Sequence, residues 1–121
     1  DLLSTALRSS ERPFPKSMRL LKPIEFQHTF AQGKRYRCRF FTVTACVNEL
    51  KHPRLGLAIS RKHAPRAVER NRIKRVVRES FRCNATRMGP VDIVVQATAT
   101  ARSESSDVLS RKLEVLWSKL E

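Results

Sequence analysis

The sequence predicts an α+β or split α/β domain in which a small sheet packs against helices. Two stretches of alternating apolar residues precede a strongly basic amphipathic segment, and a third alternating stretch follows it. Another amphipathic segment closes the chain. With 121 residues, the chain has the length of one domain and can bury a core that needs no disulfide support.

The first predicted element is a short helix from about Pro23 to Gln32. Pro23 suits the first helical turn, where a proline gives up no intrahelical hydrogen bond. Phe26 and Phe30 are spaced i, i+4 and therefore share one face of the helix. Gly33 follows at the position where a helix stop is expected.

Three strands are predicted from patterns of period two. Residues 39–48 are rich in β-branched and aromatic side chains, and both faces of this strand are fairly apolar. After a polar turn, apolar and small residues alternate over residues 55–60, and a hairpin is the simplest connection between these two strands. Residues 91–98 form the third strand, with Ile93 and Val95 on one face. The pattern leaves open which strands are neighbours.

The segment from Arg66 to Arg82 is strongly basic, yet it also has the apolar stripe of a helix with one buried face. The stripe consists of Ile73, Val76, Val77, Ser80 and Phe81. At about 100° per residue, the opposite side holds Asn71, Lys74, Arg75, Arg78 and Arg82, with Arg72 and Glu79 beside them. Arg70 falls toward the apolar side, where we expect it to be partly buried or to orient a neighbour. Like charges spaced i, i+4 repel each other, so this ridge favours a polyanionic partner.

The two ends of the chain are predicted to differ. Residues 1–17 mix Ser, Arg and Pro without an apolar period, so we expect a flexible arm. Residues 18–121 contain every predicted element and are expected to form a single domain. Near its end, apolar residues recur at helical spacing from Leu109 to Leu120, with Ser106 as the expected helix cap.

The net charge points to nucleic acid as the leading partner. The chain has 25 Lys and Arg residues against 11 Asp and Glu residues, and its net charge of +14 exceeds what solubility requires. Basic residues outside the central helix include Lys34, Arg35, Arg37, Arg39, Arg61 and Lys62. No apolar run approaches the roughly 18 residues of a membrane span, and no signal-peptide pattern is seen. We therefore expect neither membrane insertion nor secretion.

The cysteines predict free thiols in a reducing cytoplasm. Cys38, Cys46 and Cys83 are odd in number and lack the spacing of a zinc site, so we expect each thiol to be buried or partly buried. The three histidines lie far apart, and neither a carboxylate cluster nor a Gly-rich phosphate loop accompanies them. We therefore expect no catalytic or metal site on the protein itself.

Aromatic side chains offer a second mode of RNA binding, because any base can stack on a ring. Phe26, Phe30 and Tyr36 lie close in sequence to basic residues and are candidates for such stacking. Core packing is the alternative for the two phenylalanines, and their spacing alone favours it. Their helix is short, however, so one ring can remain open to a groove.

The stretch from Arg70 to Arg82, preceded by the residues from Leu55 to Lys62, resembles the signature of the bacterial ribonuclease P protein subunit. The similarity runs in order from the helix with Phe26 and Phe30 to the closing helix, over about residues 18–120. It implies a two-layer α/β sandwich with a small mixed sheet, in the approximate order α-β-β-β-α-β-α. It also implies a left-handed βαβ crossover through the basic helix, against the usual right-handed rule.

The same resemblance implies an RNA-binding subunit that assists the catalytic RNA of ribonuclease P in removing the 5′ leader from precursor tRNA. In that family the RNA performs the hydrolysis, so Mg²⁺ is expected in the holoenzyme, held mainly by RNA, with none bound by the protein alone. The expected partners are ribonuclease P RNA and precursor tRNA. Composition alone fits a ribosomal or general RNA-chaperone protein equally well, and a self-sufficient nuclease is the rival from another class.

The expected site residues fall into two groups. Phe26 and Phe30 match the aromatic pair of the family's leader-binding cleft, and Tyr36 is expected to join them. Contacts with the catalytic RNA and the substrate are expected from the basic motif and the residues around it. These residues are Arg61, Lys62, Arg66, Arg70, Asn71, Arg72, Lys74, Arg75, Arg78 and Arg82. No catalytic residue is expected.

Overall fold

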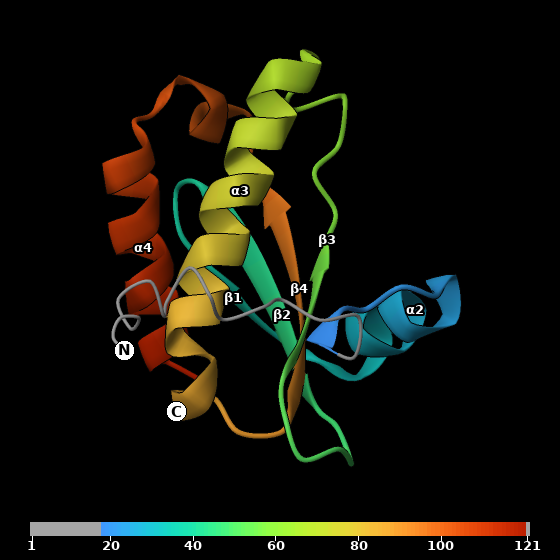
Figure 1. Ribbon diagram of the computed structural model, residues 1–121. Coiled ribbons are helices and arrows are strands. Elements are labelled where there is room, and N and C mark those ends of the chain that lie inside the picture. Colours follow the sequence, from blue (N-terminus) through green and yellow to red (C-terminus); the bar gives the residue numbers. More distant parts are fainter. Residues whose placement is uncertain (1–17, 121) are drawn as a thin grey trace, which may run out of the picture.

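The computed structural model describes residues 18–120, and Figure 1 shows their arrangement. The predicted arm at residues 1–17 lies outside the described residues. The described elements are α2 (Pro23–Gln32), β1 (Lys34–Arg37), β2 (Phe41–Val47), β3 (Arg54–Leu57), α3 (Ala67–Asn84), the 3-10 turn η2 (Ala85–Arg87), β4 (Val91–Ala97), the 3-10 turn η3 (Ala99–Ser103) and α4 (Ser106–Ser118). This order confirms the α+β class and the expected α-β-β-β-α-β-α succession.

The described strands form a mixed sheet in the order β1-β2-β4-β3. Strand β2 runs antiparallel to both β1 and β4, whereas β3 runs parallel to β4. The predicted hairpin between β2 and β3 is therefore wrong, because β4 lies between them. Seven residue pairs, from Phe41↔Ala97 to Val47↔Val91, join β2 to β4 over their full length. This long ladder outweighs the local preference for a hairpin.

The connection from β3 through α3 to β4 is left-handed. In Figure 1 both strands point upward, α3 crosses in front of the sheet, and β4 lies to the left of β3. A right-handed connection would have moved to the right. The basic helix is thus the crossover element of the expected left-handed βαβ unit.

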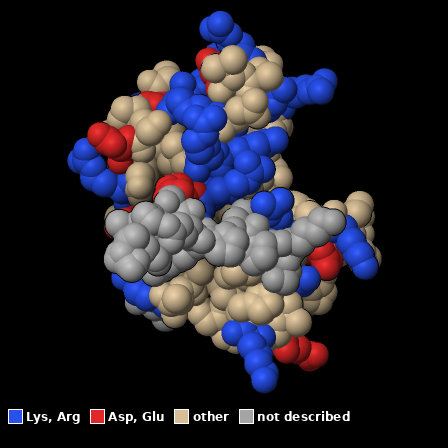
Figure 2. Space-filling model, in the orientation of Figure 1, with Lys and Arg blue, Asp and Glu red and all other residues tan. Residues whose placement is uncertain are grey.

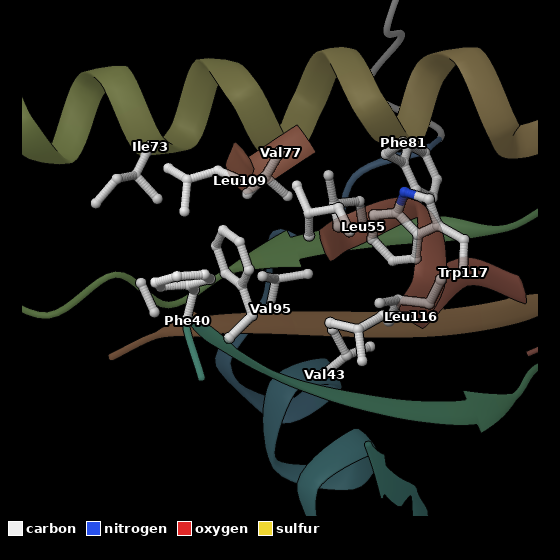
Figure 3. Close-up of a cluster of buried hydrophobic side chains, with 14 of the residues drawn as sticks. Phe40, Val43, Leu55, Ile73, Val77, Phe81, Val95, Leu109, Leu116 and Trp117 are labelled. Carbon is white, nitrogen blue, oxygen red and sulfur yellow. The ribbon is translucent and has the colours of Figure 1, made fainter. Parts of the chain in front are cut away.

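The main core lies between the sheet and the pair α3 and α4 (Figure 3). The side chains of Ile73, Val77 and Phe81 point from α3 toward the sheet and are fully buried. The Trp117 ring from α4 meets Phe81 edge-on, with 6.3 Å between ring centroids. Its Nε1–H donates a hydrogen bond to the Ser80 hydroxyl oxygen at 2.8 Å. The predicted stripe of α3 is confirmed, with Val76 half-buried at its margin and the other members buried.

The start of α4 differs by one residue from the prediction. The hydroxyl oxygen of Ser105, not Ser106, accepts a hydrogen bond from the backbone N–H of Val108 at 3.3 Å. Ser106 is the first helical residue, and its hydroxyl accepts a hydrogen bond from Arg72 instead. Adjacent serines offer the same capping chemistry, so only the backbone conformation distinguishes them.

Helix α2 packs on the other face of the sheet. Side chains alternate along a strand, so Leu55 enters the core beneath α3 while Arg54 and Gly56 point to the opposite face. The ring of Phe26 lies against Gly56, since a Cβ built on that glycine would come within 2.8 Å of two ring atoms. A Cβ built on Gly33 would lie 2.5 Å from the carbonyl oxygen of Thr29 in α2 and 2.8 Å from Cγ2 of Thr44 in β2. These two glycines let α2 approach the sheet closely.

Candidate nucleic-acid interface

The outer side of α3 carries a ridge of basic side chains. In Figure 2, which has the orientation of Figure 1, Lys and Arg side chains gather over α3 in the upper part of the view. Arg66, Asn71, Arg75 and Arg78 are exposed, and Lys74 is half-buried. Within residues 18–120, neither Arg75 nor Arg78 forms an ion pair, so both guanidinium groups are available to an external anion.

The two arginines that flank Asn71 are partly used inside the protein. Arg70 Nη1 donates hydrogen bonds to the carbonyl oxygens of Ala64 and Pro65, at 3.0 and 2.9 Å. Arg72 Nη1 donates to Ser106 Oγ at 3.2 Å, and its Nη2 donates to the Arg102 carbonyl oxygen at 3.0 Å. Arg70 thus orients the approach to α3, as its position on the helical wheel suggested. Arg72 ties α3 to the start of α4.

The last turn of α3 departs from the outward ridge. Arg82 was expected to face outward, but its side chain is only 10% exposed and pairs with Glu79 one turn earlier. The neighbouring Cys83 is exposed, so the expectation of a buried or partly buried thiol is wrong there. Cys38 and Cys46 are half-buried and free, as predicted. The helix is amphipathic to its end, and Cys83 falls on its outer side.

The turn between β3 and α3 presents two further cations. Arg61 and Lys62 are exposed within it. Ser60 organises this turn, because its hydroxyl oxygen accepts the backbone N–H of His63 at 3.2 Å and its carbonyl accepts that of Ala64 at 3.0 Å. The His63 ring also contacts the Ser60 hydroxyl, with 3.0 Å between Nδ1 and Oγ. A self-bonded turn holds Arg61 and Lys62 beside the start of the basic helix.

Phe26 and Phe30 share one face of α2, and both are half-buried. Phe26 packs against Gly56, so part of its ring belongs to the α2 contact and part remains accessible. Core packing and an open ring, the two alternatives predicted from the sequence, therefore both apply to Phe26. Beyond α2, Thr42 and Gln96 on this face of the sheet line a pocket of about 220 Å³.

Tyr36 does not lie with the two phenylalanines. It pairs with Val43 in the β1–β2 ladder and packs against the core beneath α3 and α4, so it occupies the opposite face of the sheet. Lys34 lies on that same face, with its Nζ 5.5 Å from the centre of the Tyr36 ring. The alternate residues of β1, Arg35 and Arg37, point to the α2 side. The period-two patterns of the sequence did not predict β1. They therefore could not show which face of the sheet the Tyr36 side chain occupies.

Ion pairs hold α2 against the sheet. Arg54 donates to Asp92 through Nε and Nη2, at 2.8 and 2.7 Å, and to Glu25 of α2 through Nη1 at 2.9 Å. Burial raises the pKa of Asp92, but hydrogen bonds from Arg54 and Asn48 outweigh that effect and leave the pKa below its ordinary value. The backbone N–H of Lys22 is the main cause that lowers the pKa of Glu25, with Leu21 and Arg54 contributing. All three charges are therefore present at neutral pH.

In the described part of the chain, no group of three or more His, Cys, Asp and Glu side chains is arranged to hold a metal ion. Among the helices of residues 18–120, none has both the length and the apolar composition needed to cross a membrane. The features that remain are the ridge on α3, the turn with Arg61 and Lys62, and the open sheet face beside α2.

This combination defines a class, the small basic α/β sandwich with a left-handed crossover through its cationic helix. Comparison with known proteins gives the family. The profile of the family described as Ribonuclease P matches residues 14–121, and the chain belongs to that family.

Relatives and solved structures agree with this assignment. The chain is 51% identical over 104 residues to the ribonuclease P protein component of Methylococcus capsulatus, covering 86% of this chain and 81% of the relative. The RNase P protein of Staphylococcus aureus superposes with a TM-score of 0.80 at 33% identity, covering 87% of this chain and 98% of the other. The Thermotoga maritima protein gives 0.76 at 30% identity, covering 85% and 97%.

Proposed function

We propose that this chain is the RNA-binding subunit of a ribonuclease P holoenzyme and assists its catalytic RNA in removing the 5′ leader from precursor tRNA. The observation that carries the proposal is the ridge on α3, where Arg75 and Arg78 stand exposed without an ion pair among the described residues. Unpaired guanidinium groups on a rigid helix suit the phosphates of a folded RNA, because each can bond two phosphate oxygens at once.

In this proposal the chemistry belongs to the RNA. The protein supplies cations and stacking surfaces, and Mg²⁺ in the holoenzyme is held mainly by RNA. The basic ridge on α3, with Arg61 and Lys62 beside it, contacts the catalytic RNA and the nearby substrate. Arg70 and Arg72 contribute through the orientation they give to the ridge and its approach, as well as through their remaining N–H groups.

The 5′ leader is proposed to lie in the cleft between α2 and the uncovered part of the sheet. Phe26 and Phe30 are the aromatic side chains of that cleft, and a half-buried ring offers a fixed face on which a base can stack. Tyr36, which lies on the opposite face of the sheet, is left out of the leader cleft. Its place on the α2 side is taken by Arg35 and Arg37.

The deciding experiment is a processing assay with labelled precursor tRNA and Mg²⁺, with and without ribonuclease P RNA. We expect stimulation that depends on the leader and appears only when the RNA is present. Cleavage by the protein alone would instead identify a self-sufficient nuclease. Stimulation of unrelated RNA folding, without any effect on processing, would identify a general RNA chaperone.

The electrostatic contribution to RNA binding has its own test. If about six phosphates are neutralised, with a slope near −0.7 in log affinity per contact, a fourfold rise in salt should weaken RNA binding by two to three orders of magnitude. The affinity of the protein for ribonuclease P RNA, measured over a series of salt concentrations, gives this slope directly. A slope near zero would contradict binding through the α3 ridge.

A further inference from the structure

A groove between α3 and α4, which we call the α3–α4 groove, opens on the outer side of the helical layer. It has a volume of about 360 Å³ and is lined by Val76, Glu79 and Cys83 of α3 and by Asp107, Ser110 and Glu114 of α4. Three of these side chains are carboxylates, and Arg75 is the single cation that lines the groove within residues 18–120. The groove is therefore acidic, although the net charge of the chain is +14.

The chemistry of the α3–α4 groove defines what can fill it. Its carboxylates repel phosphate groups and attract cations, so a nucleic acid is disfavoured as the occupant. Apolar surface lies beside them, because Val76 packs at the margin of the core and the Cys83 side chain is exposed. A protein segment that carries apolar side chains close to basic ones is the matching occupant.

A second observation at the edge of this groove indicates a missing hydrogen-bond acceptor. At about 100° per residue, the position of Arg82 on α3 lies between those of Arg75 and Arg78. Those two side chains are exposed, whereas that of Arg82 is 10% exposed. Its Nη2 donates to Glu79, but its Nη1 is buried and has no hydrogen-bond partner within residues 18–120. Buried N–H groups are usually paired, so we expect an oxygen acceptor from outside the described residues.

The described chain begins beside these same turns of α3. Met18 lines a pocket of about 240 Å³ together with Ala85 and Thr86, which follow the last turn of the helix. The backbone N–H of Leu20 donates to the carbonyl oxygen of Leu55 in β3 at 2.9 Å. Strand β3 and helix α4 lie on opposite sides of α3 (Figure 1). A segment that runs from Met18 to the α3–α4 groove therefore passes over or around the last turns of α3.

Residues 1–17 have both the length and the composition for this path. Extended chain covers about 3.3 Å per residue, so the stretch between Leu7 and Met18 can reach about 35 Å, whereas a helix is about 10–12 Å across. Leu2, Leu3 and Leu7 are apolar, and Arg8 and Arg12 follow them closely. Every residue of the segment also brings a backbone carbonyl oxygen, the acceptor that Arg82 Nη1 lacks.

We propose that residues 1–17 dock across the last turns of α3 and fill the α3–α4 groove of the same chain. The leucines lie on the apolar surface of the groove, and Arg8 and Arg12 face Glu79 and Glu114. A carbonyl oxygen of the segment accepts the hydrogen bond from Arg82 Nη1. This inference concerns the side of α3 next to α4 and does not depend on the proposed function.

The test measures how fast the Cys83 thiol reacts with iodoacetamide, in the full chain with Cys38→Ala and Cys46→Ala so that one thiol remains. Leu3→Asp with Leu7→Asp should raise this rate about tenfold, as expected for a segment that is docked about nine-tenths of the time. Both leucines lie outside the described domain, so its unfolding transition should stay the same. An unchanged rate in this variant would overturn the inference.

Charge exchange tests the same contact from the side of the groove. Glu114→Arg should raise the rate of Cys83 modification, and Arg8→Glu with Arg12→Glu in the same chain should restore protection. Glu49→Arg, the same charge change at an exposed position outside the groove, is the matched control and should leave the rate unchanged.

Two further outcomes would assign the groove to another occupant. Protection that grows with protein concentration would identify a second copy of the chain, and protection that appears only after ribonuclease P RNA is added would identify the RNA. Each of these results would overturn docking within one chain.

Discussion

Arg54 and Asp92 form a doubly hydrogen-bonded ion pair on the sheet face beneath α2. The two bonds measure 2.8 and 2.7 Å, and Asn48 adds a third to Asp92 at 2.8 Å. The remaining Nη1 group of Arg54 reaches Glu25 on α2. Two residues further along β3, Gly56 receives the ring of Phe26. The ion pair therefore fixes the helix that carries the proposed leader cleft.

Removal of Arg54 should destabilise the fold. The Asp92 side chain is only 7% exposed, so Arg54→Met leaves a nearly buried carboxylate without its cation and should lower the free energy of unfolding by about 3 kcal/mol. Denaturant unfolding measures this change. Arg111→Met, at an exposed position of α4, is the matched control and should stay within about 0.5 kcal/mol. An equal effect of both substitutions would mean that the pair contributes nothing specific.

The same network predicts a loss of stability in acid. The pKa values of Asp92 and Glu25 are lower in the folded protein than their ordinary values. The two carboxylates therefore contribute their full stabilisation above their pKa in the unfolded chain, which is about 4. That contribution is lost as the pH falls through their lower pKa in the folded protein. Unfolding free energies measured at decreasing pH should fall in this window. Asp92→Asn should be less stable at neutral pH and show a flatter decline, and an identical decline would contradict the prediction.

Gly56 should tolerate no side chain without cost to the cleft. A Cβ there would lie 2.8 Å from Cε2 and Cζ of Phe26 and 3.0 Å from Cβ of Leu20. Gly56→Ala should displace the Phe26 ring and lower the free energy of unfolding by about 1 to 3 kcal/mol. It should also weaken the binding of leader-bearing precursor tRNA more than that of mature tRNA. Filter binding with both RNAs measures this difference.

Gly89→Ala is the control for Gly56. Gly89 has a φ of 72°, where an L residue is strained, but a Cβ there would touch nothing. This substitution should cost about 1 kcal/mol of stability and leave the ratio between the two RNAs unchanged. If Gly56→Ala behaves in the same way, the Phe26 ring does not depend on Gly56 for its position.

The elements that local patterns encode were predictable from the sequence. The bounds of α2 came from Pro23 and Gly33, and the buried stripe of α3 came from the period of its apolar residues. The neighbours of β3 were not predictable, because the β3–β4 pairing joins residues about 38 positions apart, as in Arg54↔Asp92. The left-handed crossover followed only from the family resemblance, since the general rule favours the other hand.

The candidate site shows the same division. The charge pattern indicated the ridge on α3, but it could not show that Arg72 bonds the Arg102 carbonyl or that Arg82 turns inward, since both depend on tertiary contacts.

The buried hydrogen bond between Ser80 and Trp117 should matter for folding and not for RNA contact. Ser80→Ala leaves the indole N–H without a partner in the core, so the free energy of unfolding should drop by about 1 to 3 kcal/mol. The salt dependence of RNA binding by the folded variant should equal that of the unmodified protein. A changed salt slope would place this part of α3 in the RNA contact.

The salt slope should also separate the arginines of α3 by role. Arg75→Gln and Arg78→Gln each remove an exposed guanidinium that forms no ion pair among residues 18–120, so each should weaken binding to ribonuclease P RNA and reduce the magnitude of the slope by about 1. Arg72→Gln instead loses hydrogen bonds to Ser106 and Arg102, so it should lower stability by about 1 to 3 kcal/mol and change the slope less. Equal slope changes for all three substitutions, at unchanged stability, would make Arg72 a phosphate contact like the others.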